Sequence, residues 1–183
     1  KIKQFREYLL EVNLHVNLVS RSKSEVVVND LIFDSLAMIT LIEFAEGALV
    51  LVIGSGAGFP WIIHKIVRPD LRIVTVDSNQ RKIEFQKSAA RKPGLSDCRF
   101  VADRIEKLPP VGADYAIAKA FGSPDLIAKV AAPHLKTGGG LLLPRIGSKS
   151  VAVDLPGFLQ EGTFEYKSSP SGRISNLLIL KKI

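Results

Sequence analysis

The stretch from Ala48 to Pro60 constrains the fold of this chain more than any other part of the sequence. It reads ALVLVIGSGAGFP, an apolar run that ends abruptly in three glycines separated by single small residues. A short apolar run closed by glycines is typical of a buried strand that enters a tight turn. Because Ile62, Ile63 and Ile66 follow at helical spacing, the sequence predicts a strand, a glycine turn and a helix. This unit forms the nucleotide-binding corner of doubly wound α/β sheets.

The spacing of the three glycines narrows the class of ligand. A dinucleotide site needs Gly-x-Gly-x-x-Gly, but Phe59 stands in the sixth place, which disfavours NAD and FAD. The sequence contains no Gly-x-x-x-x-Gly-Lys-Ser/Thr and therefore no P-loop. The spacing Gly54-x-Gly56-x-Gly58 is instead similar to the first motif of class I S-adenosylmethionine-dependent methyltransferases. A purely structural turn between strand and helix is the alternative interpretation.

A second β-rich run, 72–76, ends at an acidic residue, Asp77. In a βαβ unit, an acidic residue about 20 positions after the glycine turn accepts hydrogen bonds from ribose hydroxyls. Asp77 has this position. The alternative is that Asp77 caps the helix that we expect to start near Asn79.

Composition and charge exclude some classes of protein. The 183 residues are 46% hydrophobic and carry one cysteine, Cys98, which cannot form an internal disulfide. No apolar run approaches the roughly 18 residues of a membrane span, and no signal-peptide pattern is present. We therefore expect a cytoplasmic protein. The three histidines are far apart in sequence, so we predict no metal site. The formal net charge of +7 suits a polyanion such as nucleic acid, although many basic proteins bind none.

The remaining pattern predicts an α/β protein with a single domain over 1–183. We expect an N-terminal helical cap over 1–46 and a doubly wound α/β core over 47–183. Because the first residue is Lys1, we also expect that some N-terminal residues precede it. The expected helices cover 1–13, Ser22 or Ser24 to about Glu46, 59–67, 79–91, a short turn through Glu106, 124–134 and a segment near 148–160. The expected strands cover 49–53, 72–76, 98–102, 114–118, 141–143, 162–167 and 174–181. This order predicts the class I, Rossmann-like methyltransferase fold, a seven-stranded, mostly parallel sheet with an antiparallel hairpin at its edge.

Several motifs along the chain together resemble the RsmG family, also called GidB. They are, in chain order, Asn13-x-x-x-Asn17-Leu18, Asp34-Ser35-Leu36, GSGAGFP at 54–60, VDSNQRKIEF at 76–85, Arg104-Ile105-Glu106, Ala118-Lys119-Ala120 and Arg173 before LLIL. Members of this family are bacterial methyltransferases that methylate N7 of a guanine in 16S ribosomal RNA. The resemblance implies S-adenosyl-L-methionine as the cofactor, and 16S rRNA or the small ribosomal subunit as the partner.

The candidate site residues come from the glycine spacing, the strand ends and this resemblance. The candidate cofactor-binding residues are Gly54, Gly56, Gly58, Phe59, Asp77, Ile105, Glu106 and Lys119. The candidate RNA-binding residues are Lys119, Arg145 and Arg173. Lys119 and Arg145 follow expected strands, and ligands of open α/β sheets bind at the carboxyl ends of strands.

The sequence departs from the family pattern at several positions. Val52 stands where an acidic residue is usual, and Lys119 stands where arginine is usual. Trp61 replaces a usual glycine, so its ring either packs on the core side of the helix or projects into the cofactor crevice. Asp34 belongs either to core hydrogen bonds or to the wall of a substrate site, and Phe121 either stacks on a base or packs in the core.

The chemistry of guanine N7 suits a chain without an obvious general base. N7 carries an exposed lone pair and no proton, so we name no catalytic acid or base. The Asn/Asp-Pro-Pro-aromatic motif of exocyclic-amine methylation is absent after the strand over 114–118, and Cys98 is expected far from the site. Two alternatives stay open. One is a class I methyltransferase that acts on a small molecule or protein, and the other is a degenerate, non-catalytic RNA-binding homologue.

Overall fold

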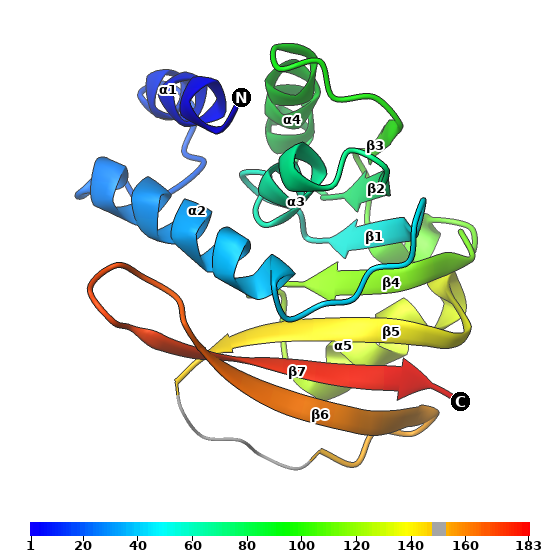
Figure 1. Ribbon diagram of the computed structural model, residues 1–183. Coiled ribbons are helices and arrows are strands. Elements are labelled where there is room, and N and C mark those ends of the chain that lie inside the picture. The colour runs from blue at the N-terminus through cyan, green and yellow to red at the C-terminus, as the bar shows by residue number, and fades with distance from the viewer. Residues whose placement is uncertain (148–152) are drawn as a thin grey trace.

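The computed structural model describes residues 1–147 and 153–183. Seven strands form one sheet in the order β3-β2-β1-β4-β5-β7-β6, which runs from top to bottom in Figure 1. The strands are β1 (Leu49–Ile53), β2 (Arg72–Val76), β3 (Cys98–Val101), β4 (Ala113–Ala118), β5 (Leu135–Ile146), β6 (Phe158–Lys167) and β7 (Ile174–Lys182). β1 to β5 pair in parallel, and β7 is antiparallel to both β5 and β6. The predicted fold class is therefore confirmed.

Helices cover both faces of the sheet (Figure 1). They are α1 (Ile2–Asn13), α2 (Ser24–Ile39), α3 (Trp61–Val67), α4 (Gln80–Arg91), α5 (Pro124–Ala131) and the 3₁₀ turns η1 (Ile105–Lys107) and η2 (Ala132–His134). Side chains alternate across the sheet, so Val50 and Val52 pack on the face that α1 to α4 cover. Leu51 and Ile53 pack on the opposite face, with η1 and α5. Burial on both faces explains why β1 is apolar throughout. Val52, where the family pattern has an acidic residue, is 2% exposed.

One boundary in the N-terminal part of the chain differs from the prediction. α2 ends at Ile39 rather than near Glu46. The backbone of the following segment is held by other contacts, because the Arg68 guanidinium donates to the carbonyl oxygens of Phe44 and Ala45. The proposed division between a cap over 1–46 and a core over 47–183 stays a prediction. Within the described residues, no helix has both the length and the apolar character needed to cross a membrane.

β5 is longer than the predicted strand over 141–143, and it includes the three glycines at 138–140. A Cβ atom on Gly139 would lie only 3.1 Å from the carbonyl oxygen of Asp114 in β4. Glycine thus lets the strand pair closely with β4 over residues that precede the predicted strand. At its other end β5 continues to Ile146, where Arg145 pairs with Asn176 of β7, so Arg145 lies within β5, near its carboxyl end, rather than after the strand.

The helix predicted near 148–160 is wrong over the residues that the structure describes. Residues 148–152 lie outside them. Residues 153–157 are not helical, and β6 begins at Phe158, which pairs with Lys182 of β7. The backbone N–H of Val153 donates to Gln160 Oε1 at 3.0 Å. Pairing with β7 therefore overrides the local helical pattern.

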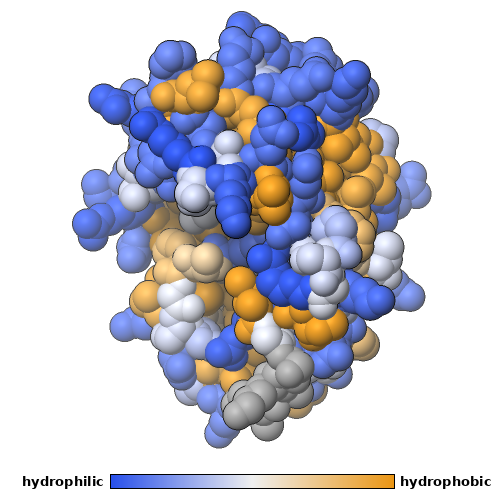
Figure 2. Space-filling model, turned by 90° about the vertical axis from the view of Figure 1, so that its left-hand side faces the viewer, coloured by the Kyte–Doolittle hydropathy of each residue, from blue (hydrophilic) through white to orange (hydrophobic). Residues whose placement is uncertain are grey.

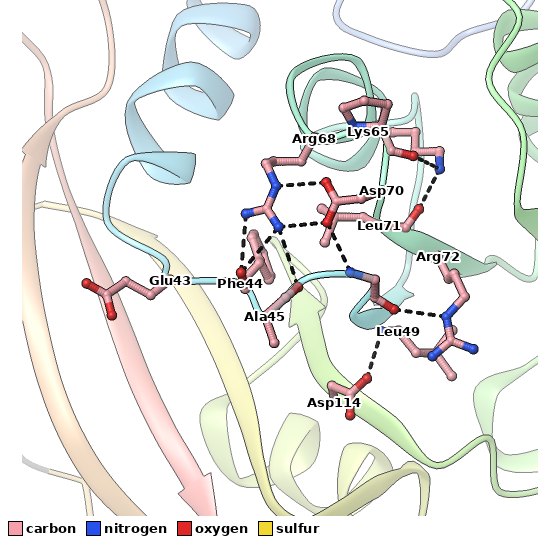
Figure 3. Close-up of polar contacts among 12 residues, drawn as sticks. Glu43, Phe44, Ala45, Leu49, Lys65, Arg68, Asp70, Leu71, Arg72 and Asp114 are labelled. Atoms are coloured by element: carbon pink, nitrogen blue, oxygen red, sulfur yellow. Dashed lines mark hydrogen bonds and ion pairs between the residues drawn. The ribbon is translucent and has the colours of Figure 1, made fainter.

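A polar cluster joins the segments that precede β1 and β2 (Figure 3). Arg68 donates from Nε to Asp70 Oδ1 at 2.8 Å and from Nη2 to Asp70 Oδ2 at 2.7 Å. Asp70 Oδ2 also accepts from the Gly47 N–H at 3.1 Å. The hydrogen bonds from Arg68, followed by that from Gly47, hold the pKa of Asp70 well below its usual range. This cluster fastens the amino ends of the parallel strands, opposite the end where ligands of such sheets bind.

Candidate functional site

The glycine loop after β1 has the backbone conformation that the sequence predicts. Gly54, Gly56 and Gly58 all have positive φ, at 64°, 54° and 88°, a region that favours glycine. The N–H groups of Gly54 and Ser55 donate to the carbonyl oxygen of Val76, at 2.9 and 3.1 Å. The loop is therefore tied to the end of β2, at the carboxyl edge of the sheet.

Asp77, directly after β2, fastens this loop. Its Oδ2 accepts from the Gly56 N–H at 2.8 Å, and its Oδ1 accepts from the Asn79 N–H at 2.9 Å. The N-cap of α4 is Asn79, whose side chain accepts from the N–H groups of Arg81 and Lys82. The interpretation of Asp77 as the cap of this helix is therefore wrong. A bond from Asp77 to ribose stays a prediction.

A first cavity of about 370 Å³ opens beside the glycine loop. Its lining residues are Gly54, Val76, Asp77, Ser78, Asp103, Arg104, Ile105, Glu106, Ala120 and Phe121. Four of the eight candidate cofactor residues thus surround one space. The Phe121 ring covers Gly54 so closely that a Cβ there would lie 2.6 Å from Phe121 Cδ2. Phe121 therefore packs against the glycine loop and forms part of the wall of the first cavity.

The other candidate cofactor residues do not line this first cavity. Gly58 packs on α3, because a Cβ there would lie 2.4 Å from Ile62 Cδ1. Phe59 is buried, with its ring edge-on to Phe5 of α1 at 5.4 Å between centroids. Gly56 contributes its N–H to Asp77. The contacts predicted between these residues and a cofactor stay predictions.

A second cavity, of about 570 Å³, lies on the other side of the loop after β4. Lys119, Arg145 and Arg173, the three candidate RNA-binding residues, all contribute to its wall, together with residues of α2, α5 and β6. Ala120 lines both cavities. The carboxyl ends of β1, β4 and β5 point to the left-hand side of Figure 1, and Figure 2 faces that side, where hydrophobic patches lie among hydrophilic residues.

The wall of the second cavity contains a partly buried ion pair. Lys119 Nζ pairs with Asp34 Oδ2 of α2, and the side chains are 23% and 8% exposed. The Tyr166 hydroxyl donates to Asp34 Oδ1 at 2.8 Å. Burial raises the pKa of Tyr166, and the negative charge of Asp34 raises it further, so the phenol stays a neutral donor. Asp34 therefore takes part in hydrogen bonds of the protein interior and also lines the cavity, and its place in the wall of a substrate site stays a prediction.

The two arginines of the second cavity differ in their surroundings. Arg173 Nη2 lies 3.3 Å from Asp30 Oδ2 of α2, and its side chain is 42% exposed. Arg173 Nε also donates to Ser168 Oγ at 3.4 Å. Arg145 is exposed at the carboxyl end of β5. This side of the cavity therefore presents cationic groups to the solvent.

Trp61 lies behind the glycine loop, in the core. Its side chain is completely buried, and its Nε1 donates to Gln86 Oε1 at 3.0 Å. Gln86 Nε2 in turn donates to Ser55 Oγ and to the Gly56 carbonyl oxygen, each at 2.9 Å. The alternative in which the ring projects into the cofactor crevice is therefore wrong. Sequence reasoning missed Gln86, although a polar residue on the apolar face of a predicted helix was an available signal.

Two other predictions concern a cysteine nucleophile and a metal ion. Cys98 is the first residue of β3, at the amino end of the sheet, and burial raises the pKa of its thiol to about 11. A thiol with that pKa is a poor nucleophile. Among the described residues, no group of three or more histidine, cysteine, aspartate or glutamate side chains could hold a metal ion.

The fold and the glycine-loop site define a class I S-adenosylmethionine-dependent methyltransferase fold. A mutant of MtNAS in complex with S-adenosylmethionine is similar with a TM-score of 0.71 at 15% identity, covering 100% of this chain and 73% of that chain. A SAM-dependent methyltransferase from Aquifex aeolicus is similar with a TM-score of 0.65 at 14% identity, covering 100% and 99% of the two chains. At these low sequence identities, the similarity shows a shared fold alone.

The sequence then identifies the family. The model of GidB, rRNA small subunit methyltransferase G, matches residues 1–150. The ribosomal RNA small subunit methyltransferase G of Cereibacter sphaeroides is 35% identical over 187 aligned positions, which cover 99% of this chain and 88% of that protein. This chain belongs to the rRNA small subunit methyltransferase G family, whose members are S-adenosylmethionine-dependent enzymes. The resemblance drawn from the motifs is confirmed.

Proposed function

We propose that this chain transfers the methyl group of S-adenosylmethionine to N7 of a guanine in 16S ribosomal RNA. The observation that carries the proposal is the pair of cavities that share Ala120. The first is bounded by the glycine loop and Asp77, and the second by three cationic side chains. A methyl donor on one side and an RNA base on the other would meet at this shared wall.

The residues around the first cavity suit an adenosine group. Its volume of about 370 Å³ lies within the usual range for small-ligand pockets. The glycine loop provides a cradle without side chains, and Asp77 carries a carboxylate at the end of β2, where ribose hydroxyls are bound in such folds. Ile105 is buried and apolar, and Glu106 is exposed. We propose that they border the adenine, and that the bound cofactor supplies an electrophilic methyl group on a sulfonium centre.

The residues around the second cavity suit an RNA substrate. Lys119, Arg145 and Arg173 supply positive charge for phosphate groups and hydrogen-bond donors for base edges. Guanine N7 attacks with its own lone pair, so no side chain has to remove a proton. The protein then has to hold the base and the methyl group in line, which can lower a barrier by about 7–11 kcal/mol. This requirement agrees with a site in which we name no catalytic acid or base.

The proposal is tested by the methylation state of 16S rRNA. Nucleosides from the 16S rRNA of cells that lack this protein are compared by mass spectrometry with those of wild-type cells. We expect the loss of one 7-methylguanosine, restored when the gene is returned. An unchanged 7-methylguanosine content would contradict the proposal. Since the substrate would be the ribosomal small subunit or its RNA, the proposal also implies a cytoplasmic enzyme.

A binding experiment separates this proposal from methylation of a small molecule. RNA binding that depends on phosphate contacts weakens steeply as the salt concentration rises. We expect the affinity for a 16S rRNA fragment to fall with a log–log slope that reflects several released counterions. Weak RNA binding with no dependence on salt would favour the small-molecule alternative.

A further inference from the structure

In the wall of the second cavity, Asp34 contacts both a cationic and a phenolic side chain. Its two oxygens are shared between Lys119, from the loop after β4, and Tyr166, from β6. These partners lie 85 and 132 positions away in sequence. The three side chains come from three separate elements, so this arrangement exists only in the folded protein.

The exposure of the pair indicates what it presents to the cavity. The Asp34 side chain is 8% exposed, whereas that of Lys119 is 23% exposed. Both residues line the cavity of about 570 Å³. An ammonium group has three N–H donors, and the bond to Asp34 uses one. Lys119 therefore offers donors to a ligand while Asp34 balances its charge.

The charge balance between Lys119 and Asp34 bears on the proposed reaction, because methyl transfer moves a positive charge. In the transfer, the bond between sulfur and the methyl carbon breaks and a bond between guanine N7 and that carbon forms. The electron pair of the broken bond stays on sulfur, which becomes a neutral thioether, and the positive charge moves to the purine ring. No proton is taken up or released. An uncompensated lysine beside the purine would oppose the arrival of that charge, because like charges in a poorly solvated site repel strongly.

We propose that Asp34 is a positioning residue for methyl transfer, which fixes the Lys119 ammonium group toward the guanine and cancels its charge. The inference rests on the proposed function. The O6 and N7 atoms of guanine are acceptors on one edge of the base. Lys119 donates to O6 in this arrangement, which leaves the N7 lone pair free to attack the methyl group. Tyr166 holds the second oxygen of Asp34 and so fixes the direction of the carboxylate.

The test measures methyl transfer by wild-type protein and by the Asp34→Asn variant, using small subunits that lack the methyl group. Asparagine keeps the shape of the side chain and removes its charge. We expect kcat to fall at least tenfold, with S-adenosylmethionine affinity within twofold of wild type. We expect RNA binding to become more salt-dependent, by about one unit of slope, because Lys119 is no longer balanced. A merely structural role would change the unfolding free energy and leave this slope unaltered.

A double-variant cycle tests whether Asp34 acts through Lys119. In the Lys119→Met background, the further change Asp34→Asn is expected to lower kcat less than threefold. The variant Tyr166→Phe keeps the ion pair and should lower kcat a fewfold, which provides a second measurement if Asp34→Asn does not fold. Asp114→Asn removes an exposed ion pair with Lys136 at the other end of β4 and is the control.

The outcomes distinguish the inference from the proposed function. Active wild-type protein together with an unchanged kcat for Asp34→Asn would overturn the inference alone. The same would follow from an equal loss in the presence and absence of Lys119, or from an unchanged kcat for Tyr166→Phe if Asp34→Asn does not fold. Wild-type protein that leaves the small subunit unmethylated would overturn the proposed function, and the inference with it.

Discussion

Strand β4 has a lysine–aspartate ion pair at each end, and the two pairs differ in their surroundings. At the amino end, Asp114 Oδ1 accepts from Lys136 Nζ at 2.6 Å, and these side chains are 28% and 54% exposed. Asp114 Oδ2 also accepts from the Leu49 N–H at 2.8 Å, a contact drawn in Figure 3. At the carboxyl end, Lys119 pairs with Asp34 in the wall of a cavity, and both side chains are more buried.

These two pairs show that the residue types of an ion pair do not determine its role. The amino-end pair connects β4 to β5, and through Asp114 to β1, and exposed pairs of this kind contribute little to stability. The carboxyl-end pair lies where an open α/β sheet binds ligands. Its lysine is held beside a cavity large enough for a nucleotide base. The following experiments compare matched changes at the two ends of the sheet.

The largest expected effect comes from the glycines that flank β1. Gly56 and Gly47 both have positive φ, at 54° and 66°, and neither Cβ would meet an atom closer than 3.7 Å. Valine resists this conformation at either position. We expect Gly56→Val to weaken S-adenosylmethionine binding at least a hundredfold, and Gly47→Val to lower stability with unchanged binding. Calorimetric titration of both variants provides the measurement. If the two variants bind S-adenosylmethionine with equal affinity, the glycine loop does not bind the cofactor.

The next effect is on stability and depends on pH. His64 of α3 is completely enclosed, and burial, the largest cause, lowers its pKa from 6.5 to about 4. The Ser35 carbonyl oxygen accepts from His64 Nε2 at 3.0 Å, and Nδ1 has no partner among the described residues. The nearby charges oppose each other, since Asp34 raises this pKa and Lys119 lowers it.

The sign of the pH effect follows from the lowered pKa. The unfolded chain binds a proton on His64 below pH 6.5, whereas the folded chain resists it down to about pH 4. The stability that His64 contributes is therefore present above pH 6.5 and lost as the pH falls to about 4. We expect a loss of about 3 kcal/mol over this interval relative to His64→Gln. Denaturant unfolding at several pH values measures the difference, and parallel curves for the two proteins would contradict it.

A smaller change, in the rate of methyl transfer, is expected when the two lysines at the ends of β4 are compared. Lys119→Ala removes a charge-assisted hydrogen bond of about 1.5–3 kcal/mol, which corresponds to a turnover roughly 10- to 150-fold slower. Lys119→Arg keeps the charge and should keep turnover, whereas Lys136→Ala should leave it unchanged. Methyl transfer to small subunits at two salt concentrations measures all three variants. Wild-type turnover in Lys119→Ala would remove this lysine from the site.

Much of the fold was predictable because its signals are local. The apolar run and the glycines fixed β1 and the loop, and Asp77 followed from its distance along the chain. Gly54, Asp77, Ile105 and Glu106 were predicted separately, yet they surround one cavity because parallel strands bring their carboxyl ends to one edge.

The features that escaped prediction depend on contacts between distant residues. Tyr166 reaches Asp34 across 132 positions, and no local pattern indicates such a pair. The extension of β5 through its glycines depends on the close approach of β4, and the start of β6 depends on pairing with β7. In each case a tertiary contact overrode the local preference of the sequence.

The smallest expected effect concerns two buried polar side chains, one behind each end of the sheet. Gln86 donates two hydrogen bonds to the glycine loop, to Ser55 and Gly56. Lys65, which is also buried, donates to the carbonyl oxygens of Pro69 and Leu71 at 2.7 and 2.5 Å, near the amino end of β2. Loss of either side chain leaves buried polar atoms without partners, so both changes should lower the unfolding free energy.

Only one of these changes should alter cofactor binding. A neutral hydrogen bond contributes about 0.5–1.5 kcal/mol, so Gln86→Leu should weaken S-adenosylmethionine binding roughly three- to tenfold. Trp61→Phe keeps the bonds from Gln86 to the loop and removes only the bond that orients this amide, so its effect should be smaller. Lys65→Met should leave affinity unchanged. Calorimetric titration, with unfolding measured on the same samples, separates affinity from stability. If Gln86→Leu and Lys65→Met lower stability equally and neither changes affinity, the contacts behind the loop support the fold alone.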